Sequence, residues 1–326
     1  MLQKKIWLPT AMLLAFILIF TSCSKKNEKN EEEPHEVPTI TNETEELTRE
    51  TIVYYKDDAG YLVPVMRKIP WVEGIAKYTL RIMMDTSEQQ EDLMMMGLRP
   101  LLPGDTEILG MSIKEGIAKL DLNNAVLNCK DAAEETSMIQ GIVMTLSEFS
   151  TIDKVQFLFE GQVLETMPHG TYVKEPIGPT DINLETSDDA SANGAKVKVF
   201  FQSTSPSLYD YLIPITRVTT HENSTLETSI NELLQGPMDT DNMTIDIPPD
   251  TKLLGIQMDG GVTYINFSKE FNEIANSKKS EEMVLRAVKL TALQYPEVEE
   301  VKILVEGKEY SGSDIVDEIS VFANEW

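Results

Sequence analysis

Hydrophobic and polar residues follow one order along this chain, and that order occurs twice. Alternating apolar positions predict strands, whereas apolar residues spaced three and four apart predict helices. The elements expected in the first copy are strands at 52–55 and 61–67, a helix at 73–86, strands at 106–111 and 117–122, a helix at 132–149 and a strand at 155–159. The second copy repeats this β-β-α-β-β-α-β order between residues 195 and 311.

Three sequence blocks return in the same order, which indicates a duplicated domain. The blocks are residues 61–67 (Tyr-Leu-Val-Pro-Val-Met-Arg), 102–110 and 155–161, which return at 211–217 (Tyr-Leu-Ile-Pro-Ile-Thr-Arg), 247–255 and 301–307. The repeated unit has about 115 to 120 residues, the size of a complete domain. We therefore expect an α/β (α+β) fold in two copies, each a mixed sheet with two helices packed on one face.

The domain boundaries follow from the two copies. We expect the first domain at 51–172, the second at 195–312, a linker at 173–194 and a C-terminal tail at 313–326. The linker contains proline and glycine and is too long for a stiff hinge, so the domains are free to reorient unless they share an interface. The tail either forms a short helix that docks on the second copy or frays.

The first 22 residues are typical of an export signal. Lys4 and Lys5 precede an apolar run at 11–20 that is too short to span a bilayer comfortably. The run ends in Thr-Ser-Cys at 21–23, which is similar to a bacterial lipobox, although Phe20 stands where leucine is usual. We therefore expect lipidation at Cys23 and attachment to the extracytoplasmic face of the cell membrane. The alternative is an ordinary secretory signal with a chance cysteine.

Residues 23–50 are rich in glutamate, threonine and asparagine and lack apolar periodicity, so we expect a disordered acidic tether. The whole chain is acidic as well, with a formal net charge of −26 at pH 7. Such a surface repels phosphate backbones and anionic lipid, so no nucleic-acid partner is expected. The acidity serves either solubility or attraction of a basic protein partner.

The sequence offers little for catalysis. There are two cysteines, and Cys129 is expected to be a small packed hydrophobe and not a reactive thiol. The three histidines are His35, His169 and His221, and none has a counterpart in the other copy. One acidic pair is repeated, Asp105 with Glu160 and Asp250 with Glu306, and turn positions explain it better than a glycosidase-like site. No catalytic, cofactor-binding or metal-binding residue is therefore expected.

Other repeated or clustered side chains have structural explanations. Pro64 and Pro214 suit edge strands. Arg67 and Arg217 either pair with carboxylates inside each domain or contact a partner. Met83 and Met84 belong to the helix stripe, whereas Met94, Met95 and Met96 lie in a stretch without equal in the second copy. These three either cover the core or form a soft docking patch.

These features together resemble one known family. The lipobox, the acidic tether and the two units with Tyr-Leu-[Val/Ile]-Pro-[Val/Ile]-x-Arg and Pro-x-Asp-Thr-x-[Ile/Leu]-Leu-Gly are similar to the GerM family of sporulation and germination lipoproteins, which have two tandem GerMN domains. The resemblance implies a non-enzymatic module similar to ring-building domains of secretion machines. It implies a role with the SpoIIIA–SpoIIQ channel complex between mother cell and forespore. Only Cys23, as the lipid-bearing residue, carries over.

Two other functions stay open from the sequence alone. The first is a protein that binds or remodels peptidoglycan. The second is a ligand-binding lipoprotein of a transporter or germinant receptor, which would need a deep cleft between the domains.

Overall fold

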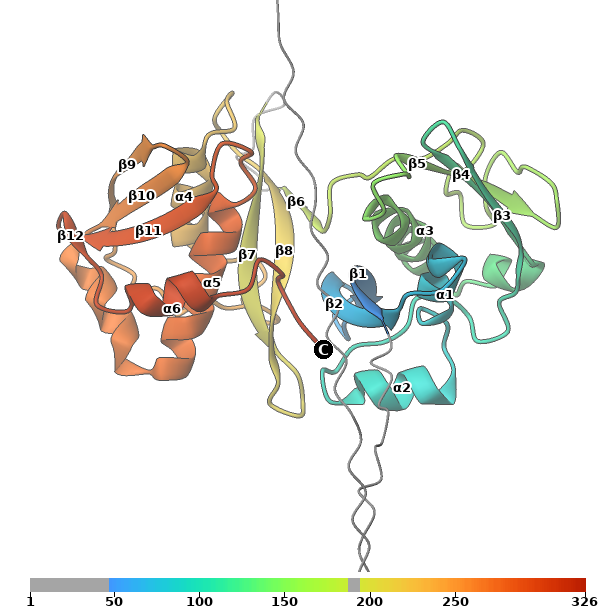
Figure 1. Ribbon diagram of the computed structural model, residues 1–326, viewed down its shortest axis with the longest axis horizontal. Coiled ribbons are helices and arrows are strands. Elements are labelled where there is room, and N and C mark those ends of the chain that lie inside the picture. Colours follow the sequence, from blue (N-terminus) through green and yellow to red (C-terminus); the bar gives the residue numbers. More distant parts are fainter. Residues whose placement is uncertain (1–46, 187–193) are drawn as a thin grey trace, which may run out of the picture. The chain divides into compact units, whose positions relative to one another are not determined.

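The computed structural model describes residues 47–186 and 194–326. The first copy contains strands β1 (Thr48–Lys56) and β2 (Leu62–Pro70), helices α1 (Ile75–Arg81) and α2 (Ser87–Met94), strands β3 (Ile108–Lys114) and β4 (Ile117–Leu122), the 3-10 helix η1 (Asn124–Leu127), helix α3 (Ala132–Ser147) and strand β5 (Lys154–Phe159). This is the predicted order with two additions, helix α2 and the 3-10 helix η1 (Figure 1).

The second copy has the same order of elements, except that its described residues contain no counterpart of α2 and add a short final strand. Its elements are strands β7 (Lys196–Thr204) and β8 (Asp210–Val218), helix α4 (Leu226–Gln235), strands β9 (Leu253–Asp259) and β10 (Val262–Phe267), the 3-10 helix η2 (Lys269–Asn276), helix α5 (Lys278–Ala292) and strands β11 (Glu300–Val305) and β12 (Lys308–Glu309). Strand β6 (Leu184–Thr186) precedes this copy, and helix α6 (Ser313–Glu318) follows it.

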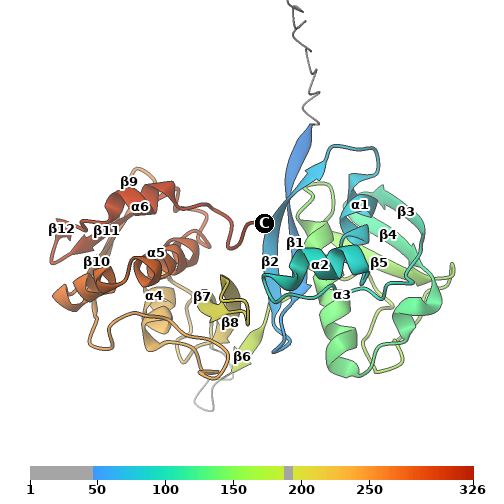
Figure 2. The same ribbon diagram turned by 90° about the horizontal axis from the view of Figure 1, so that it is seen from below.

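In each copy the strands form two sheets and not the one that we expected. An antiparallel hairpin, β1–β2 or β7–β8, is separate from a mixed sheet in which β4 and β10 lie centrally, parallel to β5 and β11 and antiparallel to β3 and β9. In the second copy α4 and α5 lie between the hairpin and the mixed sheet (Figures 1 and 2). The helices therefore bury apolar side chains against both sheets. Apolar periodicity alone does not show whether the strands that a helix contacts form one sheet or two.

The long helices form where the apolar stripe predicted them. In α3, Met138, Ile142 and Leu146 are at most 1% exposed, and the side chain of Asp131 caps the helix by accepting the Glu134 N–H at 2.9 Å. Helix α4 ends at Gly236, whose φ of 80° suits glycine.

The methionines around helix α2 lie partly in the core and partly on the surface. Met83, Met84 and Met96 are buried, whereas Met94 and Met95 are 63% and 52% exposed. Met96 therefore covers the core, and Met94 and Met95 do not.

Several boundaries differ from the prediction. Strand β1 begins at Thr48, inside the segment expected as tether, because residues 48–50 pair with the end of β2. The first helix is shorter than 73–86 because the chain turns at Ile82. The expected linker contains a strand, β6, and the tail contains helix α6, which packs on α5 and β11. Within 47–186 and 194–326, no helix has the length and apolar content needed to cross a membrane.

Candidate functional site

The junction between the two copies is built by exchange of chain segments. Residues 46–326 form one compact unit, in which β2 of the first copy approaches β8 of the second. Strand β6, which follows the first copy, pairs in parallel with β8 of the second copy. Residues 324–326, which follow the second copy, pair with β2 of the first copy through a parallel bridge between Met66 and Glu325. Each hairpin is thus extended by the segment that follows the other copy, so the domains share an interface.

Two asparagines at equivalent places close this junction. The Asn183 side chain accepts the Leu62 N–H at 2.9 Å and donates to the carbonyl oxygens of Leu62 and Pro214, both at 2.8 Å. The Asn324 side chain accepts the Leu212 N–H at 2.8 Å. It donates to the carbonyl oxygens of Leu212 and Pro64, both at 2.9 Å. Because these strand residues are repeat equivalents, the two asparagines make the same contacts with the copies interchanged.

Two tyrosines from equivalent positions also cross the junction. Tyr61 Oη donates to Asp239 at 2.7 Å, and Tyr211 Oη donates to Asp57 at 3.3 Å. The two carboxyl groups differ in environment. Burial raises the pKa of Asp57, whereas hydrogen bonds from Asn242 and Tyr61 lower the pKa of Asp239. Burial beside these carboxylates raises the pKa of Tyr211 to about 12 and also raises the pKa of Tyr61.

The repeated arginines are structural, and each pairs with carboxylates of this chain. Arg217 is 2% exposed and bonds Glu185 of β6 at 2.7 Å and Glu232 of α4 at 3.3 Å. Arg67 pairs with Asp92 of α2, which also accepts the indole N–H of Trp326 at 3.0 Å. Both arginines therefore connect their hairpin to the segment that extends it.

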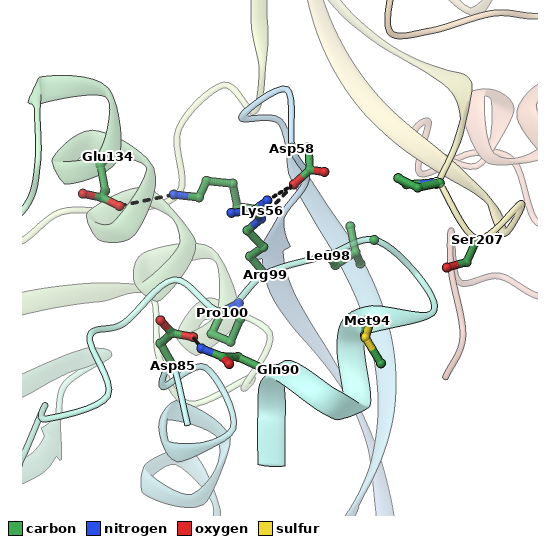
Figure 3. A pocket seen from close by; sticks show the side chains of 12 residues that line it. Lys56, Asp58, Asp85, Gln90, Met94, Leu98, Arg99, Pro100, Glu134 and Ser207 are labelled. Carbon is green, nitrogen blue, oxygen red and sulfur yellow. Dashed lines mark hydrogen bonds and ion pairs between the residues drawn. The ribbon is translucent and has the colours of Figure 1, made fainter. Parts of the chain in front are cut away.

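A cavity with a volume of about 630 Å³ lies beside α2 (Figure 3). The charged and amide side chains on its wall pair with one another: Lys56 with Glu134 at 3.5 Å, Arg99 with Asp58 at 2.7 Å and Gln90 with Asp85 at 2.8 Å. Each of these groups therefore has its partner within the wall of the cavity. No group of three or more metal-ligating side chains exists among the described residues.

The candidate residues named from the sequence do not come together. Cys23 and His35 lie outside the described residues. Cys129 is buried, and burial raises the pKa of its thiol to about 11, which suits a packed side chain. His169 contacts the Cys129 carbonyl oxygen at 2.7 Å, and His221 lies at the end of the β7–β8 hairpin.

The repeated acidic residues occupy turns. Glu160 and Glu306 have φ angles of 48° and 51°, directly after β5 and β11. Asp105 and Asp250 are exposed in the turns before β3 and β9. These positions agree with turn roles and give no reason to assign a glycosidase-like pair.

Two exposed sheet edges are the repeated surface feature of the molecule. Strands β3 and β9 are the edges of their sheets, and each has a β-bulge at the same place, around Leu109 and Leu254. These two leucines are 50% and 48% exposed, and Ile113 and Met258 further along the strands are both 45% exposed. The sequence led us to expect exposed sheet edges as contact surfaces in general. It did not identify these two strands, although the equivalent apolar positions were visible in the aligned copies.

Comparison with known proteins identifies relatives along the whole folded region. A family model described as "Germane: Sporulation and spore germination" matches residues 52–165 and again 198–311. The chain is 30% identical over 275 residues to "Spore germination protein GerM" of Bacillus subtilis (strain 168), a match that covers 82% of this chain and 73% of that protein.

The solved structure of a tandem GerMN protein agrees with this match. The tandem GerMN domains of the sporulation protein GerM from Bacillus subtilis are 28% identical, with a TM-score of 0.68 over 80% of this chain and 92% of that chain. The first GerMN domain of the same protein, solved alone, is 33% identical and covers 40% of this chain and 97% of that chain, with a TM-score of 0.37. The predicted α+β fold in two copies is thus confirmed.

Proposed function

Because this chain belongs to the Germane family of sporulation and spore germination proteins, as a member with two GerMN domains, we propose that it is a non-enzymatic assembly factor. In this proposal, acyl chains on Cys23 attach it to the extracytoplasmic face of the cell membrane. From there it stabilises the SpoIIIA–SpoIIQ type channel complex between mother cell and forespore.

The observation that carries this proposal is the pair of equivalent exposed edges, β3 and β9. Each edge has one side free of any strand in the described chain, and each presents two large apolar side chains. An open edge with apolar side chains favours addition of a partner's strand or packing of a partner's helix. The bulges at Leu109 and Leu254 interrupt the ladder and so oppose indiscriminate pairing with other chains.

Affinity capture from sporulating cells tests the role of these edges. We expect the unsubstituted protein to recover channel components, and the double variant Ile113→Glu with Met258→Glu to recover about tenfold less, because central apolar contacts dominate protein interfaces. The matched control is Val163→Glu. Val163 is 49% exposed and lies outside both edge strands. Equal recovery by the double variant would contradict the proposed surface, and recovery of none by the unsubstituted protein would contradict the proposed partner.

Labelling with a fatty-acid analogue tests the anchor separately. We expect label on the protein and its sedimentation with membranes, and loss of both in Cys23→Ala. A Cys129→Ala variant is the control, because a buried thiol is not expected to be acylated. Sedimentation of the purified protein with peptidoglycan, in place of capture of channel proteins, would favour a function at the cell wall.

A further inference from the structure

The hairpin end of the first copy presents three exposed apolar side chains. Leu47, Trp71 and Val72 are 80%, 63% and 41% exposed, and the Trp71 N–H donates to the Leu47 carbonyl oxygen at 2.7 Å. Leu47 directly precedes β1, and Trp71 and Val72 directly follow β2. The start of β1 and the end of β2 extend beyond the other elements of the first copy in Figure 2. We call Leu47, Trp71 and Val72, which lie at the open end of the hairpin and not at its turn, the hairpin tip.

The second copy lacks this feature at the equivalent place. With the offset of 150 that relates Tyr61 to Tyr211, His221 and Glu222 replace Trp71 and Val72. The difference therefore arose after duplication and is not a requirement of the fold. An exposed tryptophan that the fold does not require calls for an explanation by contact.

The charge around the tip differs between the copies as well. Residues 67–81 contain four cationic side chains (Arg67, Lys68, Lys77 and Arg81) and one carboxylate, Glu73, whereas residues 217–231 contain one arginine and two glutamates. The stretch beside the tip is thus locally cationic in a chain whose net charge is −26. Cations next to exposed apolar groups thus oppose the general repulsion from anionic surfaces at this place.

Arg49 supports the tryptophan from within the hairpin. Its guanidinium lies 5.7 Å from the ring centroid of Trp71 and 4.9 Å from that of Phe149. A cation over the indole face restrains the ring while its surface stays exposed. Glu50, the one carboxylate on β1, lies opposite Lys68 in the ladder and reduces the local positive charge without reversing it.

The hairpin tip lies close along the chain to Cys23, the proposed site of the membrane anchor. Leu47 is the first described residue, and 23 residues separate it from Cys23. Such a segment spans at most about 80 Å. If Cys23 carries the membrane anchor, as in the proposed function on which this inference rests, the tip stays within that distance of the bilayer.

We propose that Leu47, Trp71 and Val72 dock into the anionic lipid surface to which the chain is anchored. Tryptophan prefers the interfacial region of a bilayer, where its ring meets both apolar and polar surroundings. Lys68, Lys77 and Arg81 contribute attraction to anionic head groups, an attraction that salt screens. Docking turns the first copy toward the membrane and leaves edge strands β3 and β9 for protein contacts.

Tryptophan fluorescence on vesicles tests this docking directly. The chain from Cys23 onward has two tryptophans, so Trp326→Phe leaves Trp71 as the sole reporter. Coupling Cys23 to a maleimide lipid places the chain on a vesicle through its proposed anchor position, where even weak docking becomes intramolecular. We expect blue-shifted Trp71 emission and quenching by brominated lipid on phosphatidylcholine vesicles with phosphatidylglycerol. Both effects should weaken severalfold on phosphatidylcholine alone.

Substitutions separate docking from mere proximity. Leu47→Glu with Val72→Glu keeps the reporter and should reduce quenching about tenfold, because it charges the apolar surface. Leu208→Glu, at a 77% exposed leucine in the turn between β7 and β8, should leave quenching unchanged. Unfolding curves of both variants should match the reporter protein, since all three positions are exposed.

Three outcomes would overturn the proposal. Trp71 emission that is the same on vesicles as after coupling Cys23 to a soluble polymer would show no docking, and would leave the tip to a protein partner. Equal quenching on both vesicle types would refute the preference for anionic lipid. Equal quenching in the Leu47→Glu, Val72→Glu variant would refute the tip as the contact. None of these results bears on acylation of Cys23, which the labelling experiment measures separately.

Discussion

The two halves of the junction use the same geometry but differ in how firmly their extending segments are held. Strand β6 pairs with β8 over three residues and is continuous with the chain on both sides. The tail pairs with β2 through a single bridge and ends at Trp326. A segment held by a single bridge opens locally at lower free energy than one held by a ladder of three residues. The first copy therefore has the weaker half of a symmetric arrangement.

The arginines show the same difference in their surroundings. Arg217 is fully enclosed by Glu185, Glu232 and the carbonyl oxygens of Glu232 and Gly236. Arg67 has one carboxylate partner, Asp92, and its Nη1 is buried without a partner. Duplication preserved the arginine, while each copy recruited different carboxylates for it.

The largest predicted effect comes from removing these arginines. Arg217→Met leaves Glu185 and Glu232 as partly or fully buried carboxylates without their cation, and we expect a loss of about 3–5 kcal/mol in the free energy of unfolding. Arg67→Met removes a single, more exposed pair and should cost about 1 kcal/mol. Urea denaturation measures both. Equal losses in the two variants would contradict the asymmetry. A variant that removes all three charges, Arg217→Met with Glu185→Gln and Glu232→Gln, should recover part of the stability lost in Arg217→Met.

Much of this fold could be predicted because its elements are encoded locally. The stripes of α3 and α5 and the repeated strands appear as apolar periodicity. Helix α2 was missed because only Leu93 of its residues is buried, so it has hardly any stripe. Its one local signal was Thr86, which caps the helix by accepting the Gln89 N–H at 3.3 Å.

The junction could not be predicted, because its contacts join segments far apart in the sequence. Leu212 and Asn324 are 112 residues apart, and Leu62 and Asn183 are 121 apart. A lone asparagine after each copy is too short a match to be noticed, and strands of one to three residues leave no periodic signal. Pro64 and Pro214 were expected on edge strands, but Pro214 lies on β8, which is central between β6 and β7. The segments that extend the two hairpins were not visible in the sequence.

The asparagines provide the second test of the comparison. Asn324→Ala leaves the buried Leu212 N–H and the carbonyl oxygens of Pro64 and Leu212 unpaired, so we expect a loss of about 2 kcal/mol. It should also free the tail, and hydrogen exchange at the Met66 amide, which bonds the Asn324 carbonyl oxygen at 2.8 Å, should accelerate.

Asn183→Ala should cost a similar amount without freeing β6. Asn183 has a φ of 48°, which alanine tolerates poorly, so Asn183→Gly serves as the control that removes the side chain without backbone strain. Exchange at the Thr216 amide should stay slow in both variants, because Ile182 and β6 still hold it. Fast exchange there would show that the two segments are equally labile.

The prolines test the part of the junction that is symmetric. The carbonyl oxygens of Pro64 and Pro214 point away from β1 and β7 toward the asparagines, so the ring nitrogens face the junction too. Pro64→Ala or Pro214→Ala adds a buried N–H without an acceptor and should cost about 1 kcal/mol each. Thermal unfolding should give similar shifts for both, and a difference larger than about 1 kcal/mol would show that the two edges are packed differently.

The smallest predicted effect concerns Asp239 and Asp57, the carboxylates that accept hydrogen bonds from the two tyrosines. The stability of the protein should depend on pH with opposite sign at these two sites. The pKa of Asp239 is lowered in the folded state, so its contribution to stability is present above the unfolded pKa and is lost as the pH falls through the folded pKa. Asp239→Asn should therefore destabilise by about 0.5 kcal/mol at pH 7, since this group is partly exposed, and the effect should shrink as the pH falls through the folded pKa. The pKa of Asp57 is raised, so folding favours its protonated form, and stability falls as the pH rises through the folded pKa. Asp57→Asn should then be equally or more stable than the unsubstituted protein at pH 7, and should lose that advantage at low pH. Urea denaturation of both variants at several pH values measures this, and two curves of the same sign would contradict the different burial of the two sites.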